Sequence, residues 1–191
     1  VVDTDNRAIS PRHVSRYACR SGALYYFYNI LEELDAPGEW YLDRNNGLLY
    51  VYPESADSTF SLSLTEKPLI TFADAVHMTI SGLTMLCTRT NALSGTGDDL
   101  TLDHLTIRNV GGYAVTLTGY RNMVRFCEIS HTGRGGITLT GGDRTTLTPG
   151  ENVAFGNYIH AFSEVYQTYQ AGISLSGVGN RCAHNEIARS P

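Results

Sequence analysis

The chain has 191 residues, a formal net charge of −5, and a composition that is 42% apolar but only 17% charged. It is too apolar for a disordered segment and long enough to bury a core. Lys67 is the only lysine, so a basic nucleic-acid footprint is not expected. No apolar run reaches about 18 residues, so no membrane span is expected. Because the chain begins with Val1 rather than Met, we expect it to be a piece of a longer protein or a processed product.

Residues 1–67 form an aromatic-rich N-terminal flank in which several short elements are predicted. Residues 25–34 have the composition of a short helix, and the turn-forming residues 35–38 end it. Residues 40–43 and 48–52 are predicted to be strands of a β-hairpin, because Asn46-Gly47 between them is a strong hairpin signal. Apolar and polar residues alternate over 59–64, which leads into the next part of the chain.

This flank has two possible roles. It can cap or flank the repeat that follows it. Alternatively, its aromatic rings can form a wall on which sugars stack, since such rings offer flat apolar faces with a polar tip. The candidates for this wall are Trp40, Tyr41, Tyr50 and Tyr52.

Residues 68–191 contain a repeat with a basic period of 22 residues, lengthened to 30 and 28 in its later units. Each unit holds three short β-rich runs separated by Gly, Asn and Asp. Several columns of residues share these steps, two of them with extra residues where inserts are expected, and such columns predict a solenoid. The columns are Met85, Ile107, Ile129, Ile159 and Ile187; Ile80, Leu102, Val124, Ala154 and Cys182; Thr71, Leu93, Val115, Ile137 and Ile173; Ala73, Gly95, Leu117, Leu139 and Leu175; and Asn122, Asn152 and Asn180.

Three strands per unit predict an all-β parallel β-helix of about five rungs over residues 68–191. The asparagine column is interpreted as structural, because stacked amides can hydrogen-bond along a solenoid. Cys127 and Cys182 fall on inward positions and are expected to act as small core hydrophobes. The last rung carries no capping element, so we expect further rungs or a partner at that end.

Several segments resemble bacterial right-handed parallel β-helix proteins. Residues 29–43 followed by 47–50 resemble the lead-in of these proteins. The same resemblance extends to residues 141–144 with 147–150, Thr168-Tyr169 before Gly172-Ile173, and Asn185 with the turn at 177–180. The resemblance implies a right-handed helix and a carbohydrate-active enzyme, close to the β-helix glycoside hydrolases that include fucosidases and xylanases. It also implies a secreted or periplasmic protein, of which this chain is an interior segment.

Two inserts in the repeat mark the expected binding face. Residues 141–151 lengthen the turn after the first strand of one unit, and residues 160–170 follow the third strand of the same unit. Inserts in repeat proteins usually map to loops on one face, often the binding face. Both inserts flank the first strand, whose outward residues are small and would form the floor of a cleft. These residues are Thr116, Thr138 and Ser174.

Glycoside hydrolysis normally needs two carboxylates, one to protonate the leaving oxygen and one to attack or to activate water. Asp143 is the leading candidate, with Asp99 or Glu164 as its partner. Counting in steps of 22 places Asp99 and Asp143 in one column with His77 and Arg121, roughly 9–10 Å apart. Asp in a Gly-rich turn, however, usually caps its own backbone.

Further residues are assigned to substrate binding by their positions near the inserts. Arg134 and Arg144 can bind a substrate carboxylate bidentately or simply brace loops. The outward column that holds Glu128, Tyr158 and Glu186 can be a carbohydrate subsite or an ordinary solvated face. The predicted substrate-binding residues are Arg144, His131, Arg134, Tyr169 and Tyr158.

No metal site or cofactor is predicted. No two histidines share a column, and they are not expected to converge. Calcium held by loop carboxylates remains possible.

The preferred prediction is a glycoside hydrolase that acts on a polysaccharide or oligosaccharide. The first alternative is a polysaccharide lyase, which would need a base and a group that neutralises a uronate carboxylate. The second is a non-catalytic carbohydrate-binding or structural piece of a solenoid. The fold alone does not decide among these three.

Overall fold

The computed structural model describes residues 2–3, 5, 8–9, 21–22 and 28–190. The chain divides into two units, residues 1–60 and 61–191, whereas the sequence predicted a boundary after residue 67. Residues 65 and 67 already contact the repeat, because the Thr88 hydroxyl donates hydrogen bonds to their carbonyls. Within the described ranges, no helix is long and apolar enough to cross a membrane.

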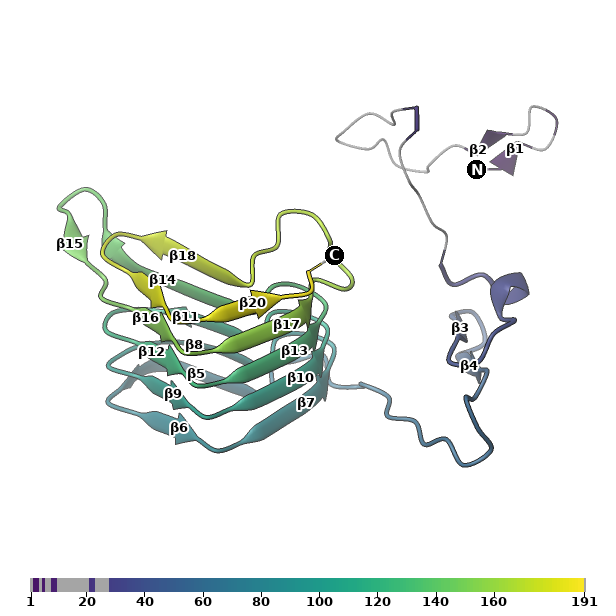
Figure 1. Cartoon of the computed structure of the whole chain (residues 1–191), viewed down its shortest axis with the longest axis horizontal. Coiled ribbons are helices and arrows are strands. Elements are labelled where there is room, and N and C mark those ends of the chain that lie inside the picture. Colours follow the sequence, from purple (N-terminus) through teal and green to yellow (C-terminus); the bar gives the residue numbers. More distant parts are fainter. Residues whose placement is uncertain (1, 4, 6–7, 10–20, 23–27, 191) are drawn as a thin grey trace. The chain divides into compact units, whose positions relative to one another are not determined.

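The first unit contains short antiparallel pairs and one helical turn. Strand β1 (Val2–Asp3) pairs with β2 (Ala8–Ile9), and β3 (Trp40–Asp43) pairs with β4 (Leu48–Val51) as a hairpin (Figure 1). The hairpin confirms the prediction from Asn46-Gly47. Gly47 has a φ of 68° at the end of the loop, a conformation that glycine adopts without steric cost.

The helix predicted over 25–34 is much shorter in the described residues. Only the 3₁₀ turn η1 (Leu31–Glu33) is helical, and residues 25–27 lie outside the described residues. Asn29 has a φ of 56° and exchanges two hydrogen bonds with the Leu42 backbone. A residue with this φ does not continue a right-handed helix, and its side-chain bonds hold the segment against β3 instead.

The four aromatic residues of the predicted sugar-stacking wall do not share one face of the hairpin. Tyr41 lies opposite Tyr50, with ring centroids 6.0 Å apart, whereas Trp40 lies opposite Val51. Because side chains alternate along a strand, Trp40 and Tyr41 point to opposite faces.

The second unit contains three parallel sheets that stack turn upon turn (Figure 1). The first sheet contains β5 (Ile70–Val76), β8 (Leu93–Asp98), β11 (Val115–Thr118), β14 (Ile137–Asp143) and β18 (Ile173–Gly177). The second contains β6 (Thr79–Ser81), β9 (Thr101–Asp103), β12 (Met123–Arg125), β16 (Val153–Phe155) and β19 (Arg181–Ala183). The third contains β7 (Thr84–Thr88), β10 (Thr106–Val110), β13 (Glu128–Thr132), β17 (Tyr158–Phe162) and β20 (Glu186–Ala188).

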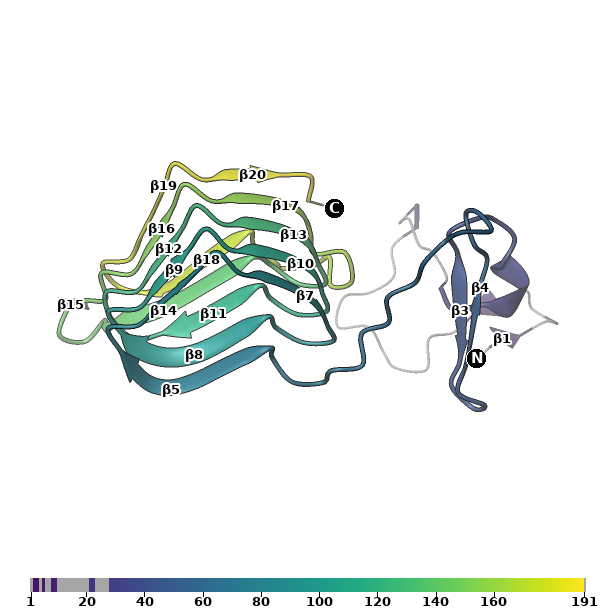
Figure 2. The ribbon, with the colours of Figure 1, turned by 90° about the horizontal axis from the view of Figure 1, so that it is seen from below.

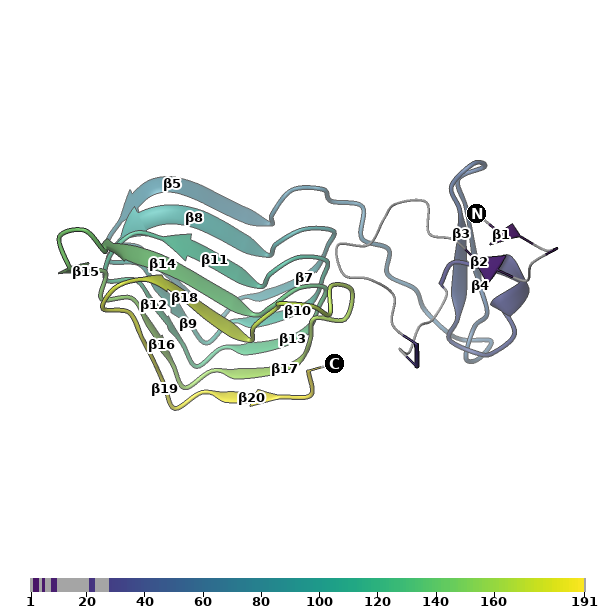
Figure 3. The same ribbon diagram turned by 90° about the horizontal axis from the view of Figure 1, so that it is seen from above.

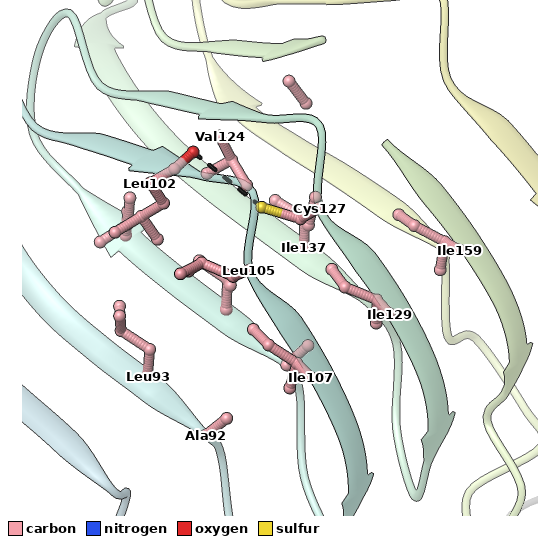
Figure 4. Packing of buried hydrophobic residues seen from close by; sticks show 14 of the residues in the cluster. Ala92, Leu93, Leu102, Leu105, Ile107, Val124, Cys127, Ile129, Ile137 and Ile159 are labelled. Atoms are coloured by element: carbon pink, nitrogen blue, oxygen red, sulfur yellow. Dashed lines mark hydrogen bonds between the residues drawn. The ribbon is translucent and has the colours of Figure 1, made fainter. Parts of the chain in front are cut away.

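Seen from below and from above, the three sheets surround one elongated interior (Figures 2 and 3), which the buried apolar cluster fills. This arrangement is consistent with a parallel β-helix. Apolar side chains from all three sheets meet inside it, among them Leu93, Leu102, Ile107 and Ile129, each of which is fully buried (Figure 4). The Cys127 thiol also lies in this core, and burial raises its pKa to about 11. Cys182 continues an inward column in the last turn, but it is exposed there.

Most predicted columns match the observed register. Ile107 pairs with Met85 and Ile129, and Val124 pairs with Leu102 and Ala154. In the asparagine column, the Asn122 N–H donates to Asn152 Oδ1 at 2.9 Å, and the Asn152 N–H donates to Asn180 Oδ1 at 3.2 Å. The prediction that this column is a structural ladder is therefore confirmed.

The first turn departs from the predicted register by one residue. Ile70 rather than Thr71 pairs with Leu93, and Phe72 rather than Ala73 pairs with Gly95. A one-residue shift turns every side chain of a strand to the other face, and this one directs apolar Ile70 and Phe72 toward the core. A bulge between Phe72 and Ala75 then restores the 22-residue step.

Each turn has three corners, and each corner contains a residue with positive φ at the same position in every turn. The first corner follows the first-sheet strand, the second follows the second-sheet strand, and the third lies near the end of the third-sheet strand. Most of these residues are not glycine, although the left-handed conformation is costly for other residues. They are His77, Asp99, Arg121, Glu151 and Gly179 at the first corner; Gly82, His104, Phe126, Gly156 and His184 at the second; and Cys87, Asn109, His131, Ala161 and Arg189 at the third.

Candidate functional site

Asp99 lies at the first corner in a bidentate ion pair with Arg121. The Arg121 Nε and Nη2 atoms donate to the two carboxylate oxygens at 2.7 and 2.8 Å, and His77 Nδ1 lies 3.7 Å from Asp99 Oδ2. The hydrogen bond from Arg121 is the main reason that the pKa of Asp99 is lowered from its ordinary value. A carboxylate held in this way stays ionised and is a poor proton donor.

Asp143 does not continue the column of Asp99 and Arg121. Met123 pairs with Val153, and the Arg121 N–H donates to the Gly150 carbonyl, so Glu151 follows Arg121 in the next turn. The extra residues form a projecting hairpin instead, in which the end of β14 pairs antiparallel with β15 (Thr148–Pro149). The expected separation of 9–10 Å between the two aspartates therefore does not apply.

The side chains of Asp143 and Arg144 brace this hairpin. Asp143 Oδ1 accepts a hydrogen bond from the Thr145 N–H at 2.7 Å, and these turn contacts lower the pKa of Asp143. Arg144 Nε donates to the Gly177 carbonyl at 3.2 Å. Both side chains therefore have a local structural partner, as the capping interpretation of Asp143 expects.

The second insert is a loop over residues 163–172 at the third corner, and the preceding turn anchors it. The Ser163 N–H donates to the Arg134 carbonyl, and the Tyr166 N–H donates to the Gly133 carbonyl. The Arg134 guanidinium lies over the Tyr166 ring, 4.1 Å from its centroid. These contacts hold the first residues of the loop, including Glu164, beside the end of β13.

Six side chains connect this loop with the outer face of the third sheet, and we call them the His–Glu cluster. Glu164 Oε1 lies 2.9 Å from His131 Nδ1, and the rings of His131 and His160 are 6.4 Å apart. His160 Nε2 lies 3.7 Å from Glu128 Oε1, and its ring is 4.4 Å from that of Tyr158. The cluster consists of Glu128, His131, Tyr158, His160, Glu164 and Arg189.

Arg189 fixes the tautomer of His160. Its Nη2 atom lies 2.9 Å from His160 Nδ1 and 3.3 Å from the Tyr158 hydroxyl oxygen. Because arginine only donates, Nδ1 must accept, and the proton of neutral His160 lies on Nε2, which faces Glu128. The His160 side chain is only 12% exposed, whereas Glu128 is 58% exposed. The cluster therefore joins a shielded imidazole to a solvent-facing carboxylate.

The structure separates the predicted site residues into two groups. Glu164, His131 and Tyr158 belong to the His–Glu cluster, and Arg134 supports its loop. Asp99, Asp143 and Arg144 lie instead at the first corner and its hairpin. Tyr169 lies on the loop of the second insert and is 85% exposed.

Sequence reasoning missed His160 and Arg189 as members of the cluster. The expectation that the histidines do not converge was wrong for His131 and His160. These two lie in adjacent strands one position apart, since His160 pairs with Ser130. A search for residues in the same column cannot find such a pair.

The predicted cleft floor on the first sheet has the expected register, since Thr116 pairs with Thr138 and Thr138 with Ser174. Its hydroxyls are partly occupied by one another, because Thr116 Oγ1 donates to Ser94 Oγ at 2.7 Å. A cavity of about 340 Å³ lies at the ends of β5, β8 and β11, where Asp74, Asp98 and Tyr120 are among its lining residues.

The part of the chain that the structure describes contains no group of three or more His, Cys, Asp or Glu side chains placed to hold a metal ion. Comparisons with protein-family models, with curated proteins and with solved structures found no match.

Proposed function

We propose that this chain is a carbohydrate-active protein that hydrolyses a polysaccharide through the carboxylates of Glu128 and Glu164. The observation that supports the proposal is the His–Glu cluster, in which two carboxylates, two imidazoles, a tyrosine and an arginine gather on one outer face. Hydrolysis of a glycosidic bond requires a proton donor and a second carboxylate, and sugar rings favour contact with aromatic faces.

In this proposal each member of the cluster has a role. Glu164 is carried by an anchored loop and protonates the leaving oxygen, with His131 beside it to exchange the proton. Glu128 activates water or attacks the sugar, and the N–H of His160 Nε2 orients its carboxylate. Tyr158 and Arg189 position the sugar. Asp99 and Asp143 have no role in the reaction, because their carboxylates are already engaged by structural partners.

The proposal extends to the fold and its setting. We propose a right-handed parallel β-helix of about five rungs, related to the bacterial carbohydrate-active β-helix enzymes that its segments resemble. A secreted or periplasmic location follows from the same resemblance, because polysaccharides are encountered there.

A second candidate function is non-catalytic carbohydrate binding. It is favoured by the contacts of the two glutamates, because a histidine ring lies next to each carboxylate and can hold it in place. Such a site can bind hydroxyl groups without releasing a proton to them.

The test is the release of reducing sugar from a panel of polysaccharides. Wild type is compared with Glu164→Gln and Glu128→Gln, and Asp143→Asn serves as the matched control at the other corner. The proposal expects turnover by wild type and Asp143→Asn, and a loss of at least 100-fold in both glutamine variants. Equal rates in all four proteins would overturn the assignment of the pair.

Binding without turnover, measured by calorimetry on the same panel, would replace hydrolysis with the second candidate function. Products that absorb in the ultraviolet would identify a lyase and also overturn the proposal.

A further inference from the structure

Four aromatic or imidazole rings form a ladder along the second corner of the repeat. His104 and Phe126 have ring centroids 5.2 Å apart, Phe126 and Phe155 are 5.7 Å apart, and Phe155 and His184 are 5.1 Å apart. These spacings follow the distance of about 4.8 Å between neighbouring strands. The ladder therefore spans successive turns and runs along the axis of the solenoid.

The backbone turns these rings outward instead of into the core. His104, Phe126 and His184 occupy the positive-φ position of this corner, which redirects the chain between the second and third sheets. In the turn that carries Phe155, Gly156 takes that position, and a Cβ there would lie 2.8 Å from the Phe126 ring. The missing side chain leaves room for Phe126 to contact Phe155 edge-on.

The ladder is accessible to solvent, although phenylalanine side chains are more often buried. Phe126 is 44% exposed, and His104 and His184 are also exposed, whereas Phe155 is half-buried. An isolated exposed apolar residue needs no explanation, but a continuous row of rings that solvent reaches is typical of a binding surface.

The groups that flank the ladder define the chemistry of its ligand. On one side, Asp103 and Arg125 form an ion pair at 3.0 Å and can both bind hydroxyl groups. On the other side lie Glu128 and Glu186, which point outward from the third sheet in the column of Tyr158. Carboxylates beside the rings would repel an anionic chain at short range.

We infer that the ladder of His104, Phe126, Phe155 and His184 is a binding track for a neutral polysaccharide whose chain lies along the solenoid axis. The ring spacing is comparable to the length of one pyranose unit, so successive sugars can contact successive rings. The flanking carboxylates and Arg125 accept and donate hydrogen bonds at the sugar hydroxyls. The inference shares its ligand class with the proposed function but does not require hydrolysis.

The test is affinity electrophoresis in gels that contain soluble xylan, mixed-linkage β-glucan or polygalacturonate. Wild type is compared with Phe126→Ala and with Phe60→Ala, a matched control whose ring is 60% exposed outside the ladder. Xylan or β-glucan is expected to retard wild type and Phe60→Ala. Phe126→Ala should bind at least fivefold more weakly, and polygalacturonate should retard none of the three proteins.

Thermal unfolding checks that Phe126→Ala is folded, and Phe126→Leu provides a second variant that keeps an apolar side chain without a ring. Equal retardation of wild type and both Phe126 variants would overturn the inference, as would the absence of any retardation of wild type. Tighter binding to polygalacturonate would contradict the neutral ligand. A second set of gels introduces each substitution into the Glu164→Gln variant instead of wild type. This background separates binding at the ladder from hydrolysis at the His–Glu cluster.

Discussion

The backbone N–H of Asn122 donates to the side-chain oxygen of Asn152 in the next turn, and both asparagines are buried. Asn152 Nδ2 in turn donates back to the Gly119 carbonyl at 2.9 Å. The ladder thus satisfies backbone groups at the first corner that no strand pairing reaches. Buried polar groups of this kind are costly to leave without a partner.

Replacing Asn152 with Ala should therefore lower the free energy of unfolding by about 1–3 kcal/mol, because the Asn122 N–H and the Gly119 carbonyl lose their partner. Asn180→Ala, which removes the half-buried last member of the same column, should cost less because water can reach that position. Urea unfolding of the two variants and wild type measures the difference. A larger loss for Asn180→Ala would contradict this account of the ladder.

The corners predict a second effect, on backbone conformation. Asn109 is exposed and has a φ of 55°. Asn109→Gly should leave the stability unchanged or raise it slightly, whereas Asn109→Val should lower it by roughly 1–2 kcal/mol, because a β-branched residue is strained at positive φ. Arg108→Val, at the exposed preceding position, is the matched control and should have little effect. Chemical denaturation compares the three, and equal stabilities would argue against strain at the corners.

A third prediction concerns Phe72 and Gly95, which are paired across the first two turns. A Cβ on Gly95 would lie 2.1 Å from the Phe72 ring, so Gly95→Ala should destabilise the protein by about 1–3 kcal/mol through overpacking. Phe72→Leu removes the edge of the ring, and in that background Gly95→Ala should cost much less. A double-mutant cycle measured by thermal unfolding gives the coupling. Additive effects would show that the two residues do not compete for this space.

Acid should weaken the pair of Asp99 and Arg121. The folded-state pKa of Asp99 is lowered below its ordinary value of 3.8, chiefly by the hydrogen bond from Arg121. A carboxylate with a lowered pKa contributes stability above its unfolded pKa and loses it as the pH falls through the folded value.

The stability difference between wild type and Asp99→Asn should therefore be constant near neutral pH and should shrink below about pH 4. It should also decrease in high salt, because the pair is exposed. Asp57→Asn, in the turn after β4, is the matched control for the substitution itself, at a carboxylate without an ion pair among the described residues. A difference that grows on acidification would contradict the assigned pairing.

The repeat could be predicted from the sequence because it places identical kinds of residue at fixed steps. Ile107 and Ile129 differ by 22 positions and pair directly, and the asparagine ladder follows the lengthened steps as well. Asn157 and Asn185 form a second ladder at 2.9 Å, which the search for columns did not identify as one because Cys127 precedes them in that column. The bulge after Phe72 was missed because a local bulge leaves no periodic signal.

The site was less predictable than the fold. Glu164, His131 and Tyr158 were candidates because they lie on or beside an insert, and they do gather near one another. Their contacts with His160 and Arg189 join side chains of different columns at the third corner. Such contacts depend on side-chain conformation, which the spacing of residues in the sequence does not show. Asp143 was misplaced for a different reason, since counting residues cannot show that an insert leaves the stack as a separate hairpin.

The three corners also differ in how much their lengths vary from turn to turn. The second corner contains two residues between strands in every described turn, from 82–83 to 184–185, whereas the first and third corners lengthen. After the hairpin of β14 and β15, the chain rejoins the stack in register, because Met123 pairs with Val153. The solenoid therefore separates a constant framework from exchangeable loops. A foreign peptide grafted in place of residues 145–147, which keeps the brace from Arg144 to Gly177, would be displayed outside the framework without altering the turns around it.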